Sequence, residues 1–321
     1  MDAVITILNA IIPAAIFAAT PLIFTALGGL FSERAGVVNI GLEGLMVMGA
    51  FSGIVFTLLF ENIGMGAASP WVAIIAAMVV GAIFSLFHAV ASITLKADQI
   101  VSGVALNFLA IGLSVFIVRE VFGRGQTDYI RNRIFRTNIP VLEDIPIIGN
   151  WFFSNVYITS YVALACVFIV WYVVFKTPFG LRLRAVGEHP TAADTMGIKV
   201  NRMKYIAVML SGAFGGIGGA VYAITVVGAF GGITITGQGF MALAALVFGK
   251  WHPFGILGAT LFFGFAQALS ITAEQIPALS NVPSVYLLIA PYVLTILALA
   301  GFVGKAEAPK ALGKAYEKGS R

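Results

Sequence analysis

The sequence is divided into apolar runs, most of them about as long as a membrane-spanning helix. A helix needs about 20 mostly apolar residues to cross the hydrocarbon core of a bilayer. Runs on this scale cover residues 4–30, 45–60, 71–95, 100–122, 156–175, 205–227, 240–249, 254–273 and 285–303. Only 10% of the 321 residues are charged, whereas soluble domains contain about 25%. We therefore expect an all-α, polytopic bundle of transmembrane helices over residues 1–303, followed by a frayed cytoplasmic tail over residues 304–321.

The number of spans depends on two of these runs. Pro13 and Pro21 interrupt the first run, which predicts either one kinked helix or two shorter pieces. The run at 240–249 is short unless it starts nearer Ile233. We therefore expect about eight to ten spans, some of them broken or re-entrant. A count of about nine would place the N-terminus outside the cell.

Lysine and arginine are concentrated in two places, the polar stretch 176–204 and the tail. Cytoplasmic segments next to membrane spans are enriched in these residues. An even number of runs separates the two clusters, so we expect both in the cytoplasm. The connection at 123–155 then lies outside, although its four arginines count mildly against this. Because the flanking clusters account for the net charge of +5, we expect no nucleic-acid partner.

Motifs for catalysis are absent from the sequence. No GxxxxGK[ST] phosphate loop is present, so we do not expect the chain to hydrolyse ATP itself. The three histidines are far apart and Cys166 is the single cysteine, which argues against a zinc site. No GxSxG elbow occurs either. We therefore expect a transport protein without catalytic residues, metal or cofactor of its own.

Residues 33–44 are the first candidate for a solute pathway, because this stretch is too polar for lipid and too apolar for an ordinary loop. Irregular backbone at membrane depth is tolerated only where it is buried in protein or lines water. In that case Asn39 and Glu43 would offer hydrogen bonds to a polar solute. The alternative is a cytoplasmic turn with Glu33 and Arg34 in water.

A break at 228–240 with five glycines is the second candidate. It is similar to the interrupted helices that form solute sites near the midplane of transporters, and the alternative is a glycine-rich external loop. Phe240 offers an aromatic face to a flat base. Asn107 is a weaker candidate, because a lone Asn on a membrane helix more often joins two helices. Overlapping GxxxG patterns at 212–219 predict close helix packing.

The polar stretch 176–204 contains a predicted short helix. Pro190 suits the first turn of a helix and Gly197 suits its C-terminal end. Between them, Ala192, Ala193 and Met196 would form a small apolar face that fits a groove on a partner. The alternative is a solvated basic loop. We interpret the stretch as a coupling loop that docks on a cytoplasmic protein.

Three long motifs resemble those of one group of permeases. They are GGLFSERAGVVNIGLEG at 28–44, LRLRAVGEHP at 181–190 and GFMALAALVFGKWHP at 239–253. The group comprises the membrane subunits of bacterial ATP-binding-cassette (ABC) importers for nucleosides and simple sugars, which are related to ribose and branched-chain amino-acid permeases. The resemblance runs from about residue 21 to the tail. Within the group, the first motif is more similar to the nucleoside branch than to the ribose branch.

This resemblance implies a subunit of a larger transporter in the bacterial cytoplasmic membrane. It implies a heterodimer with a second, homologous permease, ATPase subunits that bind ATP on the cytoplasmic face, and an extracytoplasmic solute-binding lipoprotein. In such permeases a Glu-Ala-Ala…Gly-like loop docks on the ATPase. A similar pattern is present here with His-Pro-Thr inserted, which gives as coupling residues Glu188, His189, Pro190, Ala192, Ala193 and Gly197.

The sequence therefore predicts a permease that imports a nucleoside, driven by a separate ATPase. Its expected solute pathway is lined by Asn39, Glu43, Asn107 and Phe240. A ribose-like sugar is the alternative solute. An ion-coupled secondary transporter is a second alternative, which would be expected to bury acidic residues as ion sites, and the spans hold few. A membrane-embedded enzyme would need a clustered nucleophile or metal site.

Overall fold

The computed structural model describes residues 2–140, 142–145, 149–272 and 307–317, together with Tyr286, Ile289 and Val293. In this part of the chain the regular structure is helical, apart from two isolated β-bridges. The α-helices are α1 (Asp2–Arg34), α2 (Leu42–Asn62), α3 (Ser69–Ala89), α4 (Gln99–Phe122), α5 (Ile158–Lys176), α6 (Pro178–Glu188), α7 (Pro190–Thr195), α8 (Val200–Tyr222), α9 (Gln238–Phe248) and α10 (Pro253–Thr272). Short turns of 3-10 helix (Gly66–Ala68) and π-helix (Val90–Thr94, Gly149–Phe153 and Ala223–Val227) complete them.

Six helices of the described chain are long and apolar enough to cross a membrane. They cover residues 8–34, 42–62, 66–94, 99–122, 158–176 and 200–227, and two shorter apolar helices follow at 238–248 and 253–269. The predicted run at 285–303 lies outside the described residues apart from two single positions within it, Ile289 and Val293, and Tyr286 beside them. The structure confirms the all-α, multi-pass bundle, and its described residues contain six long spans and two shorter apolar helices.

The first apolar run forms one helix, so the two-piece alternative is wrong. Pro13 and Pro21 both lie inside α1. Each proline removes one backbone hydrogen bond, which neighbouring helices and hydroxyl side chains can compensate in a membrane bundle. Because α8, α9 and α10 all pack along α1, its continuity is maintained by the surrounding bundle.

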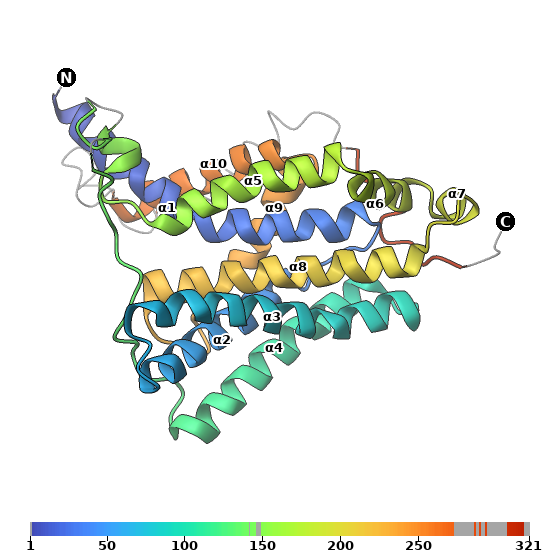
Figure 1. The fold of residues 1–321 in the computed structure, drawn as a ribbon, viewed down its shortest axis with the longest axis horizontal. Coiled ribbons are helices and arrows are strands. Elements are labelled where there is room, and N and C mark those ends of the chain that lie inside the picture. Colours follow the sequence, from blue (N-terminus) through green and yellow to red (C-terminus); the bar gives the residue numbers. More distant parts are fainter. Residues whose placement is uncertain are drawn as a thin grey trace.

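Residues 176–204 and the described part of the tail, 307–317, lie at the same end of the bundle, which we call the basic end (Figure 1). The amide of Ala311 donates to the carbonyl of Gly187 at 2.9 Å. The N-terminus and the 123–155 connection lie at the opposite end (Figure 1). The charge distribution predicted that the two basic segments share one side and that the connection lies on the other, and the count of about nine spans placed the N-terminus on the side of the connection. The tail was predicted to fray, and this is wrong for residues 307–317.

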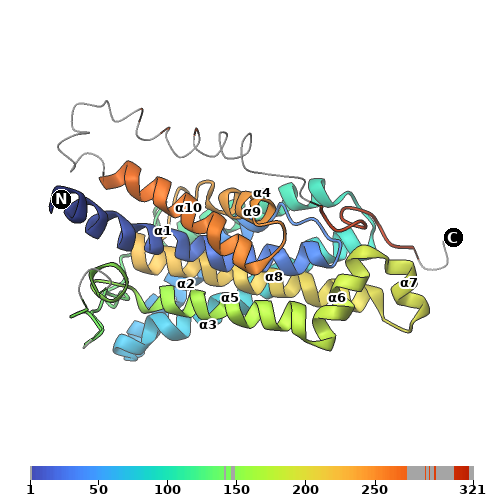
Figure 2. The same ribbon diagram turned by 90° about the horizontal axis from the view of Figure 1, so that it is seen from above.

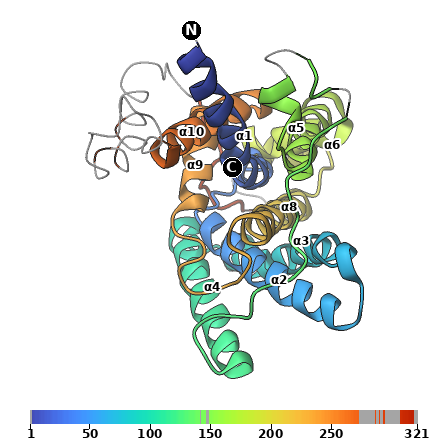
Figure 3. The same ribbon diagram turned by 90° about the vertical axis from the view of Figure 1, so that its left-hand side faces the viewer.

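Helix α8 lies in the middle of the bundle, where α1, α2 and α3 surround it, whereas α4 lies at the edge (Figure 3). The glycines of α8 allow this packing. A Cβ on Gly216 would lie 2.3 Å from the carbonyl oxygen of Ala77, and one on Gly219 would lie 2.0 Å from that of Met46. Real side chains do not approach so closely. The close packing predicted from the GxxxG patterns is confirmed.

Candidate functional site

The first break, residues 35–41, is an irregular segment buried inside the protein. After α1 ends at Arg34, the chain turns at Gly36, whose φ of +80° favours glycine. Asn39 is only 1% exposed, and its Nδ2 donates to Ser211 Oγ on α8 at 2.9 Å. The Oδ1 of Asn39 has no hydrogen-bond partner in the described chain. These contacts exclude a water-exposed turn at this position.

Asn107 on α4 binds the backbone of this break. Its Oδ1 accepts from the amide of Gly44 at 2.7 Å, and its Nδ2 donates to the carbonyl of Ile40 at 3.1 Å. An amide side chain can satisfy one donor and one acceptor at once. Asn107 therefore pairs with backbone groups that the irregular segment leaves without helical partners.

Glu43 joins the first break to the second. Its Oε1 accepts from the amide of Gly237 at 2.5 Å and its Oε2 accepts from the amide of Gly239 at 2.6 Å. These amides lie at the N-terminus of α9, where the helix dipole favours a negative charge. Gly237 has a φ of +95° and lacks a capping side chain of its own. Glu43 is 5% exposed, so a buried carboxylate caps α9 from 194 residues away.

The second break, residues 228–237, packs on the 123–155 connection and is therefore not a free external loop. Phe230 is 1% exposed. Its amide donates to Thr127 Oγ1 at 2.9 Å. Its carbonyl accepts from the amide of Thr127, also at 2.9 Å. The 123–155 connection, at the end of the bundle opposite the basic end, thus contacts the segment that leads to α9.

Phe240 differs from the other three predicted pathway residues. It lies in the first turn of α9 next to Gly239, and its side chain is 48% exposed. Asn39, Glu43 and Asn107 are instead buried and hydrogen-bonded within the chain. The structure thus brings Asn39, Glu43 and Asn107 to the first break, and Glu43 reaches the α9 start where Phe240 meets the surface.

A second buried carboxylate holds the other end of α9. Glu33 is 3% exposed, and its Oε2 accepts from Trp251 Nε1 at 2.6 Å. Arg34 donates to the carbonyl of Trp251 through Nε at 3.0 Å and through Nη2 at 2.7 Å. The alternative with Glu33 and Arg34 in water is therefore wrong.

The Trp251 turn joins α9 to α10. Lys250 and Trp251 have φ values of +53° and +50°, which cost energy in residues other than glycine. Burial, and secondly the positive charge of Arg34, lower the pKa of the neighbouring His252. Trp251 lies in the motif at 239–253 that resembles other permeases. Its hydrogen bond to Glu33, 218 residues earlier, could not be predicted from any local pattern in the sequence.

The basic end carries the predicted short helix. Helix α7 begins at Pro190 and is followed by Gly197, which has a φ of +82°. Both ends therefore lie where the proline and the glycine predicted. Helix α7 projects beyond the ends of the long helices (Figure 1), and His189 before it is exposed.

The apolar face predicted for this helix does not form as one surface. Ala193 is 4% exposed and packs against Val186 and Val200 of the same chain. Ala192 is exposed and Met196 is 82% exposed. Ala193 is therefore a core residue of this end, and the surface open to a partner comprises Ala192 and Met196.

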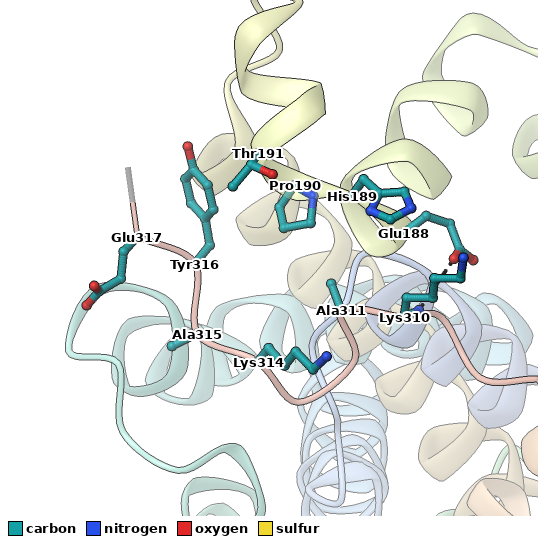
Figure 4. Close-up of a pocket in the computed structure, with 10 residues that line it drawn as sticks. All are labelled: Glu188, His189, Pro190, Thr191, Lys310, Ala311, Lys314, Ala315, Tyr316 and Glu317. Atoms are coloured by element: carbon teal, nitrogen blue, oxygen red, sulfur yellow. Dashed lines mark hydrogen bonds between the residues drawn. The ribbon is translucent and has the colours of Figure 1, made fainter. Parts of the chain in front are cut away.

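The tail forms one wall of a groove at the basic end (Figure 4). The groove has a volume of about 380 Å³ and is lined by Glu188, His189, Pro190, Thr191, Lys310, Ala311, Lys314, Ala315, Tyr316 and Glu317. The ring of Tyr316 packs on the Val186–Ala193–Val200 cluster, and its hydroxyl hydrogen-bonds Asp194. Lys96, between α3 and α4, forms an ion pair with Glu317 at 2.7 Å. The tail thus connects α7 to the neighbouring helices.

Replacing Tyr316 with alanine should loosen α7, because the ring covers part of the small cluster that holds Ala193. We expect hydrogen exchange at the amides of residues 191–196 to accelerate several-fold, which corresponds to a loss of about 1 kcal/mol. Tyr316→Phe keeps the ring and should change the exchange less. Lys314→Ala, an exposed neighbour in the tail, is the control. Equal exchange in Tyr316→Ala and Lys314→Ala would show that the tail does not stabilise α7.

The comparisons with known proteins identify the family. The family described as "Branched-chain amino acid transport system / permease component" matches residues 11–299. The chain belongs to this permease family.

The permease is similar along its whole length to two proteins named for nucleosides. It is 60% identical to the guanosine ABC transporter permease protein NupQ of Bacillus subtilis, over 99% of each chain. It is 48% identical to the nucleoside ABC transporter permease protein NupC of Lactococcus lactis, over 98% of this chain and 99% of the relative. It is 36% identical to the putative glucose ABC transporter permease protein TsgC13 of Haloferax volcanii, over 82% of this chain and 77% of the relative. The permease is a multi-pass membrane protein and a transport subunit.

Among the described residues of the permease, no group of three or more His, Cys, Asp or Glu side chains is placed to hold a metal ion.

Proposed function

We propose that this permease imports a nucleoside, with energy from a separate ATPase that docks on the basic end. The similarity over nearly the full length to two nucleoside ABC permeases carries this proposal. The geometry adds a physical reason, since the buried break at 35–41 and the partly exposed break at 228–237 are joined by the hydrogen bonds of Glu43. Irregular backbone in that position is what transporters use to build a solute route.

The solute route in this proposal runs along the surface at the start of α9. Phe240 is the predicted pathway residue that reaches this surface, and Ile233 in the preceding break is 86% exposed. Helix α4 also leaves large apolar side chains uncovered, including Phe108 at 72% and Phe116 at 61%. A second, homologous permease would cover these faces and complete the route. Glu43, Asn39 and Asn107 would act by holding the breaks rather than by lining an open channel.

Coupling in this proposal passes from α7 through α6 to the end of α1, and from there to the turn that follows α9. The Glu188 carboxylate and the Gly187 carbonyl receive hydrogen bonds from the tail. A Cβ on Gly187 would lie 2.1 Å from the carbonyl oxygen of Arg34, so α6 touches the end of α1 directly. Arg34 in turn binds Trp251, which follows α9. Closure of the ATPase pair would then shift the population of conformations at both ends of α9.

The solute is tested by uptake of labelled compounds into cells or vesicles that contain the assembled transporter. We expect guanosine and other nucleosides to be taken up, with ribose and glucose transported at least tenfold more slowly. The similarity to a putative glucose permease supports a sugar as the second candidate. Preferential uptake of sugar would replace the nucleoside proposal with that candidate.

The energy source is tested separately. Uptake that survives ATP depletion but collapses with an ionophore would indicate an ion-coupled transporter that uses the buried carboxylates.

Substitutions on the exposed face of α7 test the coupling role. Ala192→Trp and Met196→Glu should abolish uptake, because both side chains are exposed and a bulky or charged group there would prevent docking. The isolated ATPase should retain its activity and the permease should remain in the membrane. Uptake at the original rate in both test variants would remove the coupling role from α7.

A further inference from the structure

A cavity at the basic end combines a basic rim with an apolar wall, apart from the groove beside the tail. It lies between α6, the residues that follow α7, and the first two turns of α8, and it has a volume of about 520 Å³. Its lining consists of Phe179, Arg182, Met196, Gly197, Ile198, Lys199, Arg202, Met203 and Ile206. Three cations therefore surround a space that is otherwise apolar.

The charge of this cavity is uncompensated by acidic side chains. Arg182, Lys199 and Arg202 are all exposed, and no Asp or Glu lines the cavity. The ion pairs found in the described chain join Lys96 to Glu317 and Arg124 to Asp128, so none involves these three residues. The expected occupant therefore carries a negative charge.

The apolar wall indicates that the occupant also has a hydrocarbon part. Phe179 on α6 and Ile206 on α8 are partly exposed and face the same cavity. Ile206 lies four residues after Arg202, so the two share one face of α8 with the isoleucine one turn deeper in the bundle. A free inorganic anion would not use this wall.

The cavity lies beside the ends of two spans, where lipid headgroups are expected. The α5 span ends at Lys176, two residues before α6 begins, and the α8 span begins at Val200. Lys176 Nζ lies 5.6 Å from the centre of the Trp171 ring, a pairing typical of the membrane interface. Helix α6 then crosses the end of the bundle instead of continuing along α5 (Figure 2), and its Leu181 is 62% exposed.

We propose that this cavity binds an anionic phospholipid, with the phosphate held by Arg182 and Arg202 and an acyl chain lying on Phe179 and Ile206. Basic pockets between transmembrane helices on the cytoplasmic side bind anionic headgroups. The acidic surface of a docked ATPase is the competing occupant. The lipid is favoured because the apolar wall continues toward the membrane, whereas α7 projects beyond the cavity on the side of the cytoplasm. This site depends on membrane insertion and not on the identity of the solute.

The test is native mass spectrometry of the full-length permease with added phosphatidylglycerol or phosphatidylcholine. We expect phosphatidylglycerol to bind preferentially. Arg182→Gln and Arg202→Gln should each weaken this binding about fivefold, and the double variant about 25-fold. Arg182→Lys and Arg202→Lys should retain most of it. Lys310→Gln with Lys314→Gln, which removes two exposed charges from the tail at the same end, is the matched control and should have no effect on the preference.

Four outcomes would overturn the proposal. One is equal binding of both lipids. A second is a preference that the double glutamine variant retains while it remains monodisperse. Another is displacement of the lipid by inorganic phosphate at millimolar concentration, which would indicate a simple anion site. The last is loss of the bound lipid when the ATPase subunit is added, which would assign the cavity to the protein partner.

Discussion

Replacing Glu43 with alanine should abolish uptake and strongly destabilise the permease. The substitution leaves the amides of Gly237 and Gly239 without an acceptor at a buried position. Hydrogen bonds to a charged group contribute about 1.5–3 kcal/mol each, so the loss should be about 3–6 kcal/mol. This is a large share of the stability of a typical domain. Thermal unfolding of the purified protein and uptake of labelled guanosine would measure the two effects.

Glu61→Ala is a matched control for this substitution. Glu61 lies at the other end of α2, and its carboxylate also accepts from two backbone amides, those of Arg131 and Asn132. It is only half-buried, so water can replace the carboxylate and the loss should be much smaller. Similar losses of stability in Glu43→Ala and Glu61→Ala would show that the burial of Glu43 does not strengthen its hydrogen bonds to the α9 amides.

Glu43→Gln separates a structural role from contact with solute. Glutamine keeps one acceptor oxygen, so the variant should retain part of the stability and part of the uptake. If Glu43 only caps α9, the KM for solute should be unchanged and the maximal rate should fall. A large rise in KM with unchanged stability would instead place Glu43 in contact with the solute.

Replacing Gly219 with alanine should prevent correct assembly of the bundle. The added Cβ would lie 2.0 Å from the carbonyl oxygen of Met46, which is backbone and cannot move aside alone. Overpacking of this kind costs about 1–3 kcal/mol and more where backbone must shift. The yield of monodisperse protein and its unfolding temperature should both fall.

Gly112→Ala is the control for that variant, since no atom lies within 4 Å of a Cβ built on Gly112 in α4. Alanine in a helix is favoured over glycine by about 0.5–1 kcal/mol, so this variant should be unchanged or slightly more stable. Equal behaviour of the two alanine variants would contradict the close approach of α8 to α2.

The spans and their order could be predicted because a membrane helix is defined by a local run of apolar residues. The breaks at 35–41 and 228–237 were also predictable, since glycine and polar residues mark them locally. The pairing of Glu43 with Gly237 could not be predicted, because the two residues are 194 positions apart and no local sequence pattern indicates the contact. The same holds for Glu33 and Trp251.

Short amphipathic pieces were predicted less well than the long spans. Helix α7 has only six residues, which is too short for the sequence to indicate which of its alanines face the protein and which face a partner. The assignment of Ala193 to a partner surface was wrong because Val186, Val200 and the tail cover that side. The charged composition of the tail predicted fraying, whereas its contacts with Gly187 and Lys96 order residues 307–317.

The distance along the chain between Glu43 and its two amide partners has a consequence for biosynthesis. Ribosomes add about 5–20 residues per second, so α9 is made about 10–40 s after α2, given the separation of 194 residues. During that interval the Glu43 carboxylate lacks the two amides that it binds in the folded protein. Slowed translation of the second half would lengthen this interval and should increase degradation of the newly made protein.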